Sequence, residues 1–367
     1  MRKLAAGTAT ALLFALAACG GDDDTYDGDS LLVAPTPTPA PAPLPSPSSS
    51  PSPAPSPSPS GTLALTGATG PVHDPAILND NGTFYLFATG NNGDREGLLA
   101  LRTSPNLTDW TLHGGSYTAL PAWTATEVPG TGGMWAPDIV KVGGEYRLYY
   151  SISRFGENRS AIGMAVATSI NPAAPATTWQ DRGPVIQSRS SDNYNAIDPA
   201  VFTDADGRMW MAFGSFWTGI KLIELDPATG MRRAGDTIRS IASRPFPGAV
   251  EAPFVVRRGG FYYLFVSFDA CCQGAASTYN TRVGRSASPT GPYLDRDGRS
   301  MMDGGGTVVL ESGQGTGSRY VGRGHVAVVA NGGQDYIVHH AYDTTRNGFP
   351  VLQIQRLDWA DGWPVAR

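Results

Sequence analysis

The stretch His73-Asp74-Pro75-Ala76-Ile77-Leu78, followed after a short gap by Gly82-Thr83-Phe84-Tyr85-Leu86-Phe87, decides the fold, because the chain repeats its pattern. The pattern has four parts in order: a short motif containing proline, an apolar run, a glycine and an aromatic-rich run. It recurs from Trp135-Ala136-Pro137-Asp138, Ile197-Asp198-Pro199 and Glu251-Ala252-Pro253. Each copy predicts a β-hairpin whose second strand is rich in aromatic residues.

The spacing of the copies predicts the architecture. The four motif prolines follow one another at intervals of 62, 62 and 54 residues. These intervals are too long for a solenoid repeat and suit a four-stranded propeller blade. A fifth, degenerate copy covers residues 324–329 and 333–338, which places Ala327 in the proline column. We therefore expect an all-β, five-bladed β-propeller that forms a single domain over residues 61–367.

The N-terminal residues predict export. Residues 1–19 carry Arg2 and Lys3, then an apolar run that ends in Leu16-Ala17-Ala18-Cys19, as in a secretory signal. The last four residues resemble a bacterial lipobox, so Cys19 is the expected lipidation site. Residues 20–60 hold 12 of the 30 prolines and predict a disordered linker. We expect a membrane-anchored lipoprotein at the cell surface or in the periplasm, or otherwise a secreted protein.

The net charge excludes some classes of binding partner, and the cysteine content limits the disulfide bonds that the domain can form. The net charge of −5 argues against nucleic acid and anionic membrane surfaces as partners, so we expect membrane contact only through the lipid anchor. We expect a monomer. Beyond Cys19 the only cysteines are the adjacent Cys271 and Cys272, so no disulfide framework supports the domain. The sequence leaves open whether this pair forms a vicinal bridge or stays reduced.

Three carboxylic acids lie in the repeated motifs. The innermost strands of a propeller surround its axis, so Asp74, Asp198 and Glu251, at the starts of three such strands, should converge at one mouth. Like charges repel, so at least one of the three should stay protonated near neutral pH and could act as a general acid. An Asp before Pro is also a common turn element, but three acids in register favour chemistry. Asp138 follows its proline, and we assign it to turn geometry or to hydrogen bonding around the site.

Two carboxylic acids that face each other, one ionised and one protonated, are typical of glycoside hydrolysis. Aromatic side chains would supply stacking faces for sugar rings. The candidates are Trp135, Phe216 and Trp217, whereas most of the eight tryptophans should pack between blades.

These motifs resemble glycoside hydrolase family 43, and within it the endo-acting 1,5-α-L-arabinanases. The resemblance extends through a further ordered set of segments: Phe155-Gly156-Glu157-Asn158-Arg159, Gly214-Ser215-Phe216-Trp217, Cys271-Cys272-Gln273-Gly274, Val283-Gly284-Arg285-Ser286, Thr290-Gly291-Pro292-Tyr293 and Gly304-Gly305-Gly306-Thr307. It covers nearly all of residues 61–367.

The resemblance implies endo-acting hydrolysis of the α-1,5-linked arabinofuranose backbone of arabinan and arabino-oligosaccharides, with inversion at the anomeric carbon. Asp74 would be the general base and Glu251 the general acid. Asp198 would keep the pKa of Glu251 raised and hold it in position.

The same resemblance implies the binding residues. Sugar contacts are expected from Asp74, Gly156, Asn195, Ala196, Ile197, Asp198, Ser215, Phe216 and Trp217. His325 would help to hold a metal ion, usually Ca²⁺, mostly through water. Arg323 stands where many relatives have proline, and this extra cation could alter metal occupancy or pair with a carboxylate.

Two alternatives remain open. One is an exo-acting α-L-arabinofuranosidase or β-xylosidase of the same family; the end of the chain at Arg367, without the additional β-sandwich domain of many exo-acting xylosidases, favours the endo-acting form. The other is a non-catalytic glycan-binding propeller, which would be expected to lack one of the three acids. His113, His339 and His340 lie outside the motif column, and we interpret them as structural or solvent-exposed.

Overall fold

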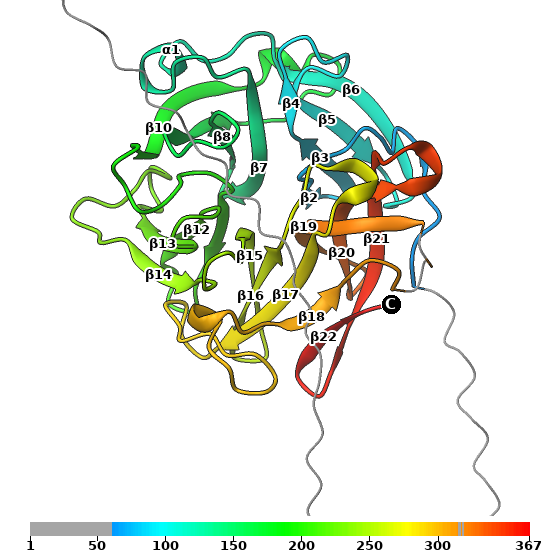
Figure 1. Ribbon diagram of the computed structural model, residues 1–367. Coiled ribbons are helices and arrows are strands. Elements are labelled where there is room, and N and C mark those ends of the chain that lie inside the picture. The colour runs from blue at the N-terminus through cyan, green and yellow to red at the C-terminus, as the bar shows by residue number, and fades with distance from the viewer. Residues whose placement is uncertain (1–60, 315–316, 318) are drawn as a thin grey trace, which may run out of the picture. The chain divides into compact units, whose positions relative to one another are not determined.

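The predicted five-bladed propeller is confirmed. The computed structural model describes residues 61–314, 317 and 319–367, and this part of the chain forms five sheets. Figure 1 shows the sheets arranged radially around one axis. The predicted signal peptide with Cys19, and the linker at residues 20–60, lie outside the described residues.

The blades follow one another in chain order. Blade 1 contains β1 (Thr66–Gly67), β2 (Ala76–Asp80), β3 (Thr83–Ala88), β5 (Leu98–Ser104) and β6 (Asp109–Tyr117). Blade 2 contains β4 (Gly90–Asn91), β7 (Gly133–Val142), β8 (Glu145–Ile152), β9 (Ser160–Ala167) and β10 (Gln180–Ser188). Blade 3 contains β11 (Ala200–Thr203), β12 (Met209–Phe213), β13 (Ile220–Leu225) and β14 (Arg239–Ala242).

Blade 4 contains β15 (Val250–Arg258), β16 (Phe261–Phe268), β17 (Asn280–Ser286) and β18 (Thr307–Leu310). Blade 5 contains β19 (Tyr320–Asn331), β20 (Gln334–Asp343), β21 (Phe349–Ala360) and β22 (Trp363–Ala366). Helical turns occur in the connections: α1 (Thr124–Glu127), Pro175–Thr177, Gly274–Ala276, Met301–Asp303 and Thr344–Arg346. None of the helices in the described residues is long and apolar enough to span a membrane.

The five predicted hairpins are the first two strands of each blade. The first strands, β2, β7, β11, β15 and β19, neighbour one another around the axis (Figure 1). Aromatic residues fill the second strands because these strands are covered on both faces by adjacent blades; Phe87, Tyr149 and Phe265 are all fully buried.

The hydrophobic core is divided among the five interfaces between blades. Each buried cluster joins residues of two consecutive blades, as Phe87 with Leu148 and Leu222 with Leu264 illustrate. Trp110, Trp210 and Trp363 belong to such clusters, which confirms that tryptophans mainly pack between blades.

An N-terminal segment closes the ring. Thr62 bridges Gln355 on β21, and the N–H of Leu63 donates to the carbonyl of Ile354 at 2.9 Å. A few residues later β1 pairs in parallel with β6 of blade 1. The segment therefore ties the last blade to the first.

Candidate active site at the blade starts

The same backbone feature recurs at the start of every innermost strand. At or just before the motif proline position, each blade has a non-glycine residue with a left-handed backbone conformation: Asp74 (φ 52°), Ala136 (43°), Asp198 (59°), Ala252 (52°) and His325 (51°). Such residues carry a conformational cost of about 1–3 kcal/mol and often mark functional sites. The left-handed residue therefore defines an equivalent position in all five blades.

Strand register corrects the alignment of the fifth blade. Glu251 pairs with Ser267 and Gly324 with His340, each just before a register shift. His325 is thus equivalent to Ala252, and Val326 occupies the proline position. The sequence prediction, which put Ala327 there, is wrong by one residue, because this blade has no proline to fix the register. Glu251 lies one residue before the left-handed column that holds Asp74 and Asp198.

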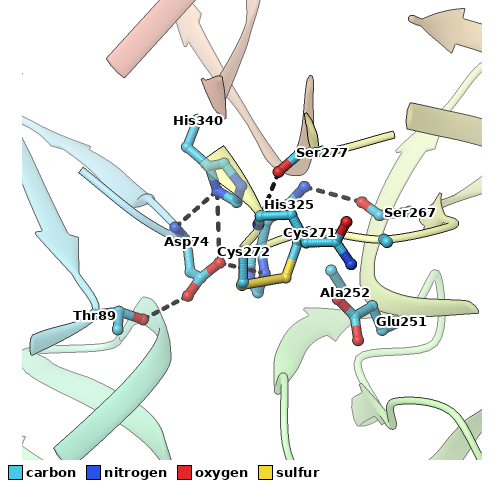
Figure 2. The surroundings of a disulfide bond; sticks show 12 residues. Asp74, Thr89, Glu251, Ala252, Ser267, Cys271, Cys272, Ser277, His325 and His340 are labelled. Carbon is cyan, nitrogen blue, oxygen red and sulfur yellow. Dashed lines mark hydrogen bonds and ion pairs between the residues drawn. A yellow bond between two sulfur atoms is a disulfide. The ribbon is translucent and has the colours of Figure 1, made fainter. Parts of the chain in front are cut away.

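The N–H groups of these left-handed residues donate to side chains of the preceding blade. The N–H of Ala136 donates to Thr89 Oγ1 at 2.8 Å, and that of Asp198 to Ser151 Oγ at 2.9 Å. The N–H of His325 donates to Ser267 Oγ at 2.9 Å (Figure 2). A hydroxyl at the end of one blade's second strand therefore fixes the start of the next blade.

Blade 3 departs from this rule, with a consequence for the site. Its equivalent second-strand position is Gly214, whose N–H donates to the carbonyl of Ile197 and which has no side chain to accept a bond. The N–H of Ala252 donates instead to Asp198 Oδ2 at 3.1 Å. This bond links the Asp198 carboxyl to the residue that follows Glu251.

Asp74 is held in its ionised form. Thr89 Oγ1 donates to its Oδ2 at 2.6 Å, and His325 Nδ1 lies 3.1 Å from its Oδ1 (Figure 2). Burial favours the neutral acid, but the charge and hydrogen bond of His325 outweigh it and hold the pKa of Asp74 well below its ordinary value. The Asp74 side chain is 19% exposed to solvent.

Glu251 has the opposite electrostatics. Burial raises its pKa, although hydrogen bonds from Ser215 and Tyr279 stabilise the carboxylate. Ser215 Oγ donates to its Oε2 at 2.7 Å. Glu251 therefore keeps its proton to higher pH than an ordinary glutamate.

Asp198 is the third acid of the cluster. Burial, with the charges of Glu251 and Asp74, raises its pKa to about 8, against the charge of His325. Because the charge of Glu251 is one cause of this raised pKa, ionisation of one of the two acids disfavours ionisation of the other. The predicted role of Asp198 as an influence on Glu251 stays a prediction.

His325 supplies the positive charge of the cluster. Burial alone lowers its pKa, but Asp74, Asp198 and Glu251 raise it to about 9. Asp74, the carboxyl that is held ionised beside His325, supplies negative charge and oxygen atoms, which a hard cation such as Ca²⁺ requires of its ligands. One imidazole is a weak calcium ligand, so water would complete the coordination of an ion held at His325.

His340 and His73 are site residues that the sequence analysis missed. Asp74 donates its N–H to His340 Nδ1 at 3.1 Å, and the rings of His73 and His340 lie 4.8 Å apart. Burial lowers the pKa of His340 well below its ordinary value, so it is neutral. His340 occupies the capping position of Thr89, Ser151 and Ser267; because imidazole and hydroxyl differ so much, the repeat was hidden in the sequence.

One other grouping could accept a metal. Within the described ranges, His73, Asp74 and His340 bring ligand atoms within 4.8 Å of one another. His340 Nδ1 already accepts the N–H of Asp74, which occupies its lone pair. We therefore do not assign a metal to this group.

Some of the predicted sugar-contacting residues lie beside the acids, as Ser215 does beside Glu251, and their role in binding sugar stays a prediction. Asn195 and Ala196 are buried beside Asp198, and Asn195 Oδ1 has no hydrogen-bond partner among the described residues. Trp135 Nε1 donates to Asn91 Oδ1 at 3.0 Å, which fixes its indole at the start of β7. Ile197 is partly exposed.

Exposed aromatic side chains occupy the loops at this mouth. Phe216 and Trp217 are 49% and 44% exposed in the loop after β12, as predicted for stacking residues. Phe155, beside the left-handed Gly156 after β8, and Phe246, before β15, are 85% and 99% exposed. The sequence analysis did not single out these two phenylalanines; their exposure was not readable from composition.

The remaining predictions concern residues around the site. Asp138 Oδ2 accepts the N–H of Val201 at 2.6 Å, which confirms its expected hydrogen-bonding role. His113 contacts Thr103 Oγ1 and is structural, and His339 is buried. Arg323 is fully buried and bonds to Gln355 Oε1, and none of its partners among the described residues is a carboxylate, so the expected pairing with a carboxylate is not found there. Its effect on metal occupancy stays a prediction.

The arrangement suits acid–base chemistry. Figure 2 shows Asp74, His325 and Glu251 converging from different blades. One carboxyl is kept ionised by a cation and another keeps its proton through burial. Such a pair can activate water and protonate a leaving oxygen at the same time.

Comparisons with known proteins agree with this chemistry. Residues 68–364 match the family described as Glycosyl hydrolases family 43. The chain is 47% identical over 295 residues to the extracellular endo-α-(1→5)-L-arabinanase 1 of Bacillus subtilis, covering 80% of this chain and 87% of the relative. It is 40% identical to the extracellular exo-α-(1→5)-L-arabinofuranosidase of Cellvibrio japonicus, covering 80% and 85%. The solved α-L-arabinanase of Cellvibrio cellulosa in complex with arabinohexaose superposes with a TM-score of 0.75 at 38% identity, covering 82% and 96%.

Proposed function

Because this chain belongs to glycosyl hydrolases family 43, we propose that it is an endo-acting hydrolase of the α-1,5-L-arabinofuranosidic linkages in arabinan. The observation that carries the proposal is the opposed electrostatics of Asp74 and Glu251 at one mouth of the propeller. The named arabinan-degrading relatives supply the substrate class.

The proposed mechanism follows from the protonation states. Asp74, ionised beside His325, accepts a proton from the attacking water. Glu251 donates its proton to the leaving glycosidic oxygen, and the anomeric configuration inverts. Asp198 holds the residue after Glu251 through the Ala252 N–H and, as a second buried acid, disfavours ionisation of Glu251.

The endo-acting form is favoured by the mouth of the site. The exposed aromatic side chains of Phe155, Phe216, Trp217 and Phe246 lie on loops of blades 2 and 3 and on the connection to blade 4, which suits a polymer bound along its length. The exo-acting relative at 40% identity makes release of arabinose the competing activity.

Product length over time on linear debranched arabinan separates the two activities. An endo-enzyme releases a spread of arabino-oligosaccharides early, whereas an exo-enzyme releases one short product throughout. Asp74→Asn and Glu251→Gln, with unchanged melting temperatures, should form no product. Wild-type turnover in either variant contradicts the assignment, and absence of product from the wild type excludes arabinan as the substrate.

Two further proposals concern the ion and the location. His325 would hold a calcium ion through water, and the ion would supply positive charge beside the carboxylates. Named extracellular relatives support export, and Cys19 would carry a lipid anchor on a monomeric enzyme. Cys19→Ala should move the protein from the membrane fraction to the soluble fraction.

A further inference from the structure

Cys271 and Cys272 form a disulfide bond, which settles the alternative that the sequence left open. The bond lies in the connection between β16 and β17, at the mouth that holds the acids. In the view of Figure 2 the disulfide is drawn over His325, with Asp74 and His340 to its left and Glu251 to its right. Cys272 is exposed and has a left-handed backbone, with φ 65°.

The bond is expected to contribute little to the stability of the fold. A disulfide stabilises a protein mainly by closing a loop in the unfolded chain, and the gain grows with loop length. Between adjacent residues the closed loop is minimal. The surrounding turn is anchored without it, since Ala270 accepts the N–H groups of Thr278 and Tyr279 at 2.9 and 3.0 Å. The role of the bond is therefore local.

The turn contacts the surroundings of both catalytic acids. On one side, the N–H of Cys272 donates to the hydroxyl of Tyr342 at 2.8 Å. The ring of Tyr342 packs against His73 at 5.4 Å and His340 at 5.5 Å, beside Asp74. On the other side, Ala270 holds the backbone of Tyr279, whose side chain hydrogen-bonds Glu251. The backbone of the turn that carries the disulfide is thus held between the neighbours of the base and those of the acid.

The disulfide also complements the exposed aromatic side chains. Over the part of the chain that the structure describes, the large exposed aromatics lie on loops of blades 2 and 3 and on the connection to blade 4. The mouth of blades 4 and 5 has no such side chain among these residues, and the disulfide turn lies there. A compact, apolar sulfur pair can cover the C–H face of a sugar ring where an aromatic ring is missing.

We propose that the Cys271–Cys272 disulfide is a substrate-contacting wall of the active site, against which the apolar face of a furanose ring in the bound α-1,5-arabinan chain packs. The proposal rests on the proposed function. It makes the bond a binding element that contributes to affinity and leaves the chemical step unchanged. Export of the protein would keep the bond oxidised.

The test compares oxidised and reduced enzyme on linear arabinan. Phosphine reduction, followed by thiol titration, should raise KM roughly three- to tenfold with kcat within about twofold, as expected for lost uniform binding. The melting temperature should not change, and reoxidation should restore KM. Cys271→Ser/Cys272→Ser should show the raised KM without reductant and no response to it.

Several results overturn the proposal. Free thiols in the untreated protein show that the bond is absent. An unchanged KM shows that the bond does not touch substrate, and a fall in kcat alone shows that it acts on the acids. A lowered melting temperature identifies a structural staple.

A binding measurement separates this proposal from the proposed function. Affinity of the Glu251→Gln variant for arabinohexaose, with and without reductant, needs no hydrolysis. If the oxidised variant binds and the wild type does not cleave, the proposed activity fails alone. If reduction leaves this affinity unchanged, the disulfide proposal fails alone.

Discussion

At the residue scale, the site depends on two carboxyl groups whose surroundings shift their pKa values in opposite directions. Asp74 lies against His325, and Glu251 is buried with two hydroxyl donors. The difference in pKa comes from these neighbours, since an isolated Asp and Glu titrate close together. The surroundings of each carboxyl assign its role.

The hydroxyl of Ser215 should set the alkaline limit of activity. It donates to Glu251 Oε2 and stabilises the carboxylate, so Ser215→Ala should raise the pKa of Glu251 further. The acid form then persists to higher pH. The wild-type rate should fall on the alkaline side, where Glu251 loses its proton at a pKa above its ordinary value, and this limb should move upward in the variant. A pH profile of kcat/KM checks this; an unchanged or lower alkaline limb contradicts it.

Chelation tests the cation proposed at His325. Treatment with a calcium chelator should lower kcat/KM, and added calcium should restore it. Calcium should also raise the melting temperature, because a ligand that binds only the native state stabilises it. His325→Ala should lose both responses. If the wild type responds to neither chelator nor calcium, protonated His325 alone supplies the positive charge.

At the element scale, the recurring unit is a left-handed residue capped by the preceding blade. This unit places side chains from different blades at one mouth, because each innermost strand starts at the same height. Where Gly214 removes the cap, Asp198 replaces it. Catalytic residues thus serve in the same hydrogen-bond positions as structural ones.

Loss of one cap should destabilise the protein. Ser151 is fully buried and accepts the Asp198 N–H, so Ser151→Ala leaves a buried donor unpaired, at a cost of about 1–3 kcal/mol. Ser116 is a matched control, since it is also buried but its hydroxyl has no partner among the described residues. Urea unfolding should show a smaller loss for Ser116→Ala. Equal losses in the two variants contradict the capping role.

The hairpins were predictable from sequence, and the capping positions were not. Glycines and aromatic runs mark the paired strands, and proline marks four of the five starts. The proline position of the fifth blade was predicted one residue too late, because valine follows His325 where the other blades have proline. His340 was missed because its capping position holds Thr, Ser, Gly, Ser and His in turn. These residues share a hydrogen-bond position and have little chemistry in common.

At the scale of the whole molecule, stability depends on ring closure. Leu63 and Leu65 pack with Leu352 and Ile354 of the last blade, while β1 pairs with the first. Because this short segment joins the two ends of the ring, we expect it to contribute more to the free energy of unfolding than other segments of the same length. The acids of blades 1 and 4 keep their relative positions only in a closed ring.

Removal of the closing segment should open the ring. A chain that starts at Gly70 loses two partly buried leucines, worth at least about 2 kcal/mol together, and their backbone bonds. Its melting temperature and activity should fall. A chain that starts at Gly61 is the control and should match the full-length protein, as the predicted linker implies. Equal stability of the two truncated chains contradicts the closing role.

The polymer-binding surface could be predicted only in part. Phe216 and Trp217 were expected from their motif, whereas the exposure of Phe155 and Phe246 depends on loops whose conformation no periodic pattern encodes. The state of Cys271 and Cys272 was equally hidden, because adjacency in sequence does not determine the turn that brings the sulfur atoms together.

The central claim is that Asp74 activates water while Glu251 protonates the leaving oxygen, and its most direct test is the stereochemistry of the first product. Proton NMR of early arabinan hydrolysis by the wild type, recorded before mutarotation, distinguishes the two anomers. The account predicts the β-anomer, formed by direct attack of water on the α-linkage. First appearance of the α-anomer would show retention through a covalent intermediate and would contradict it.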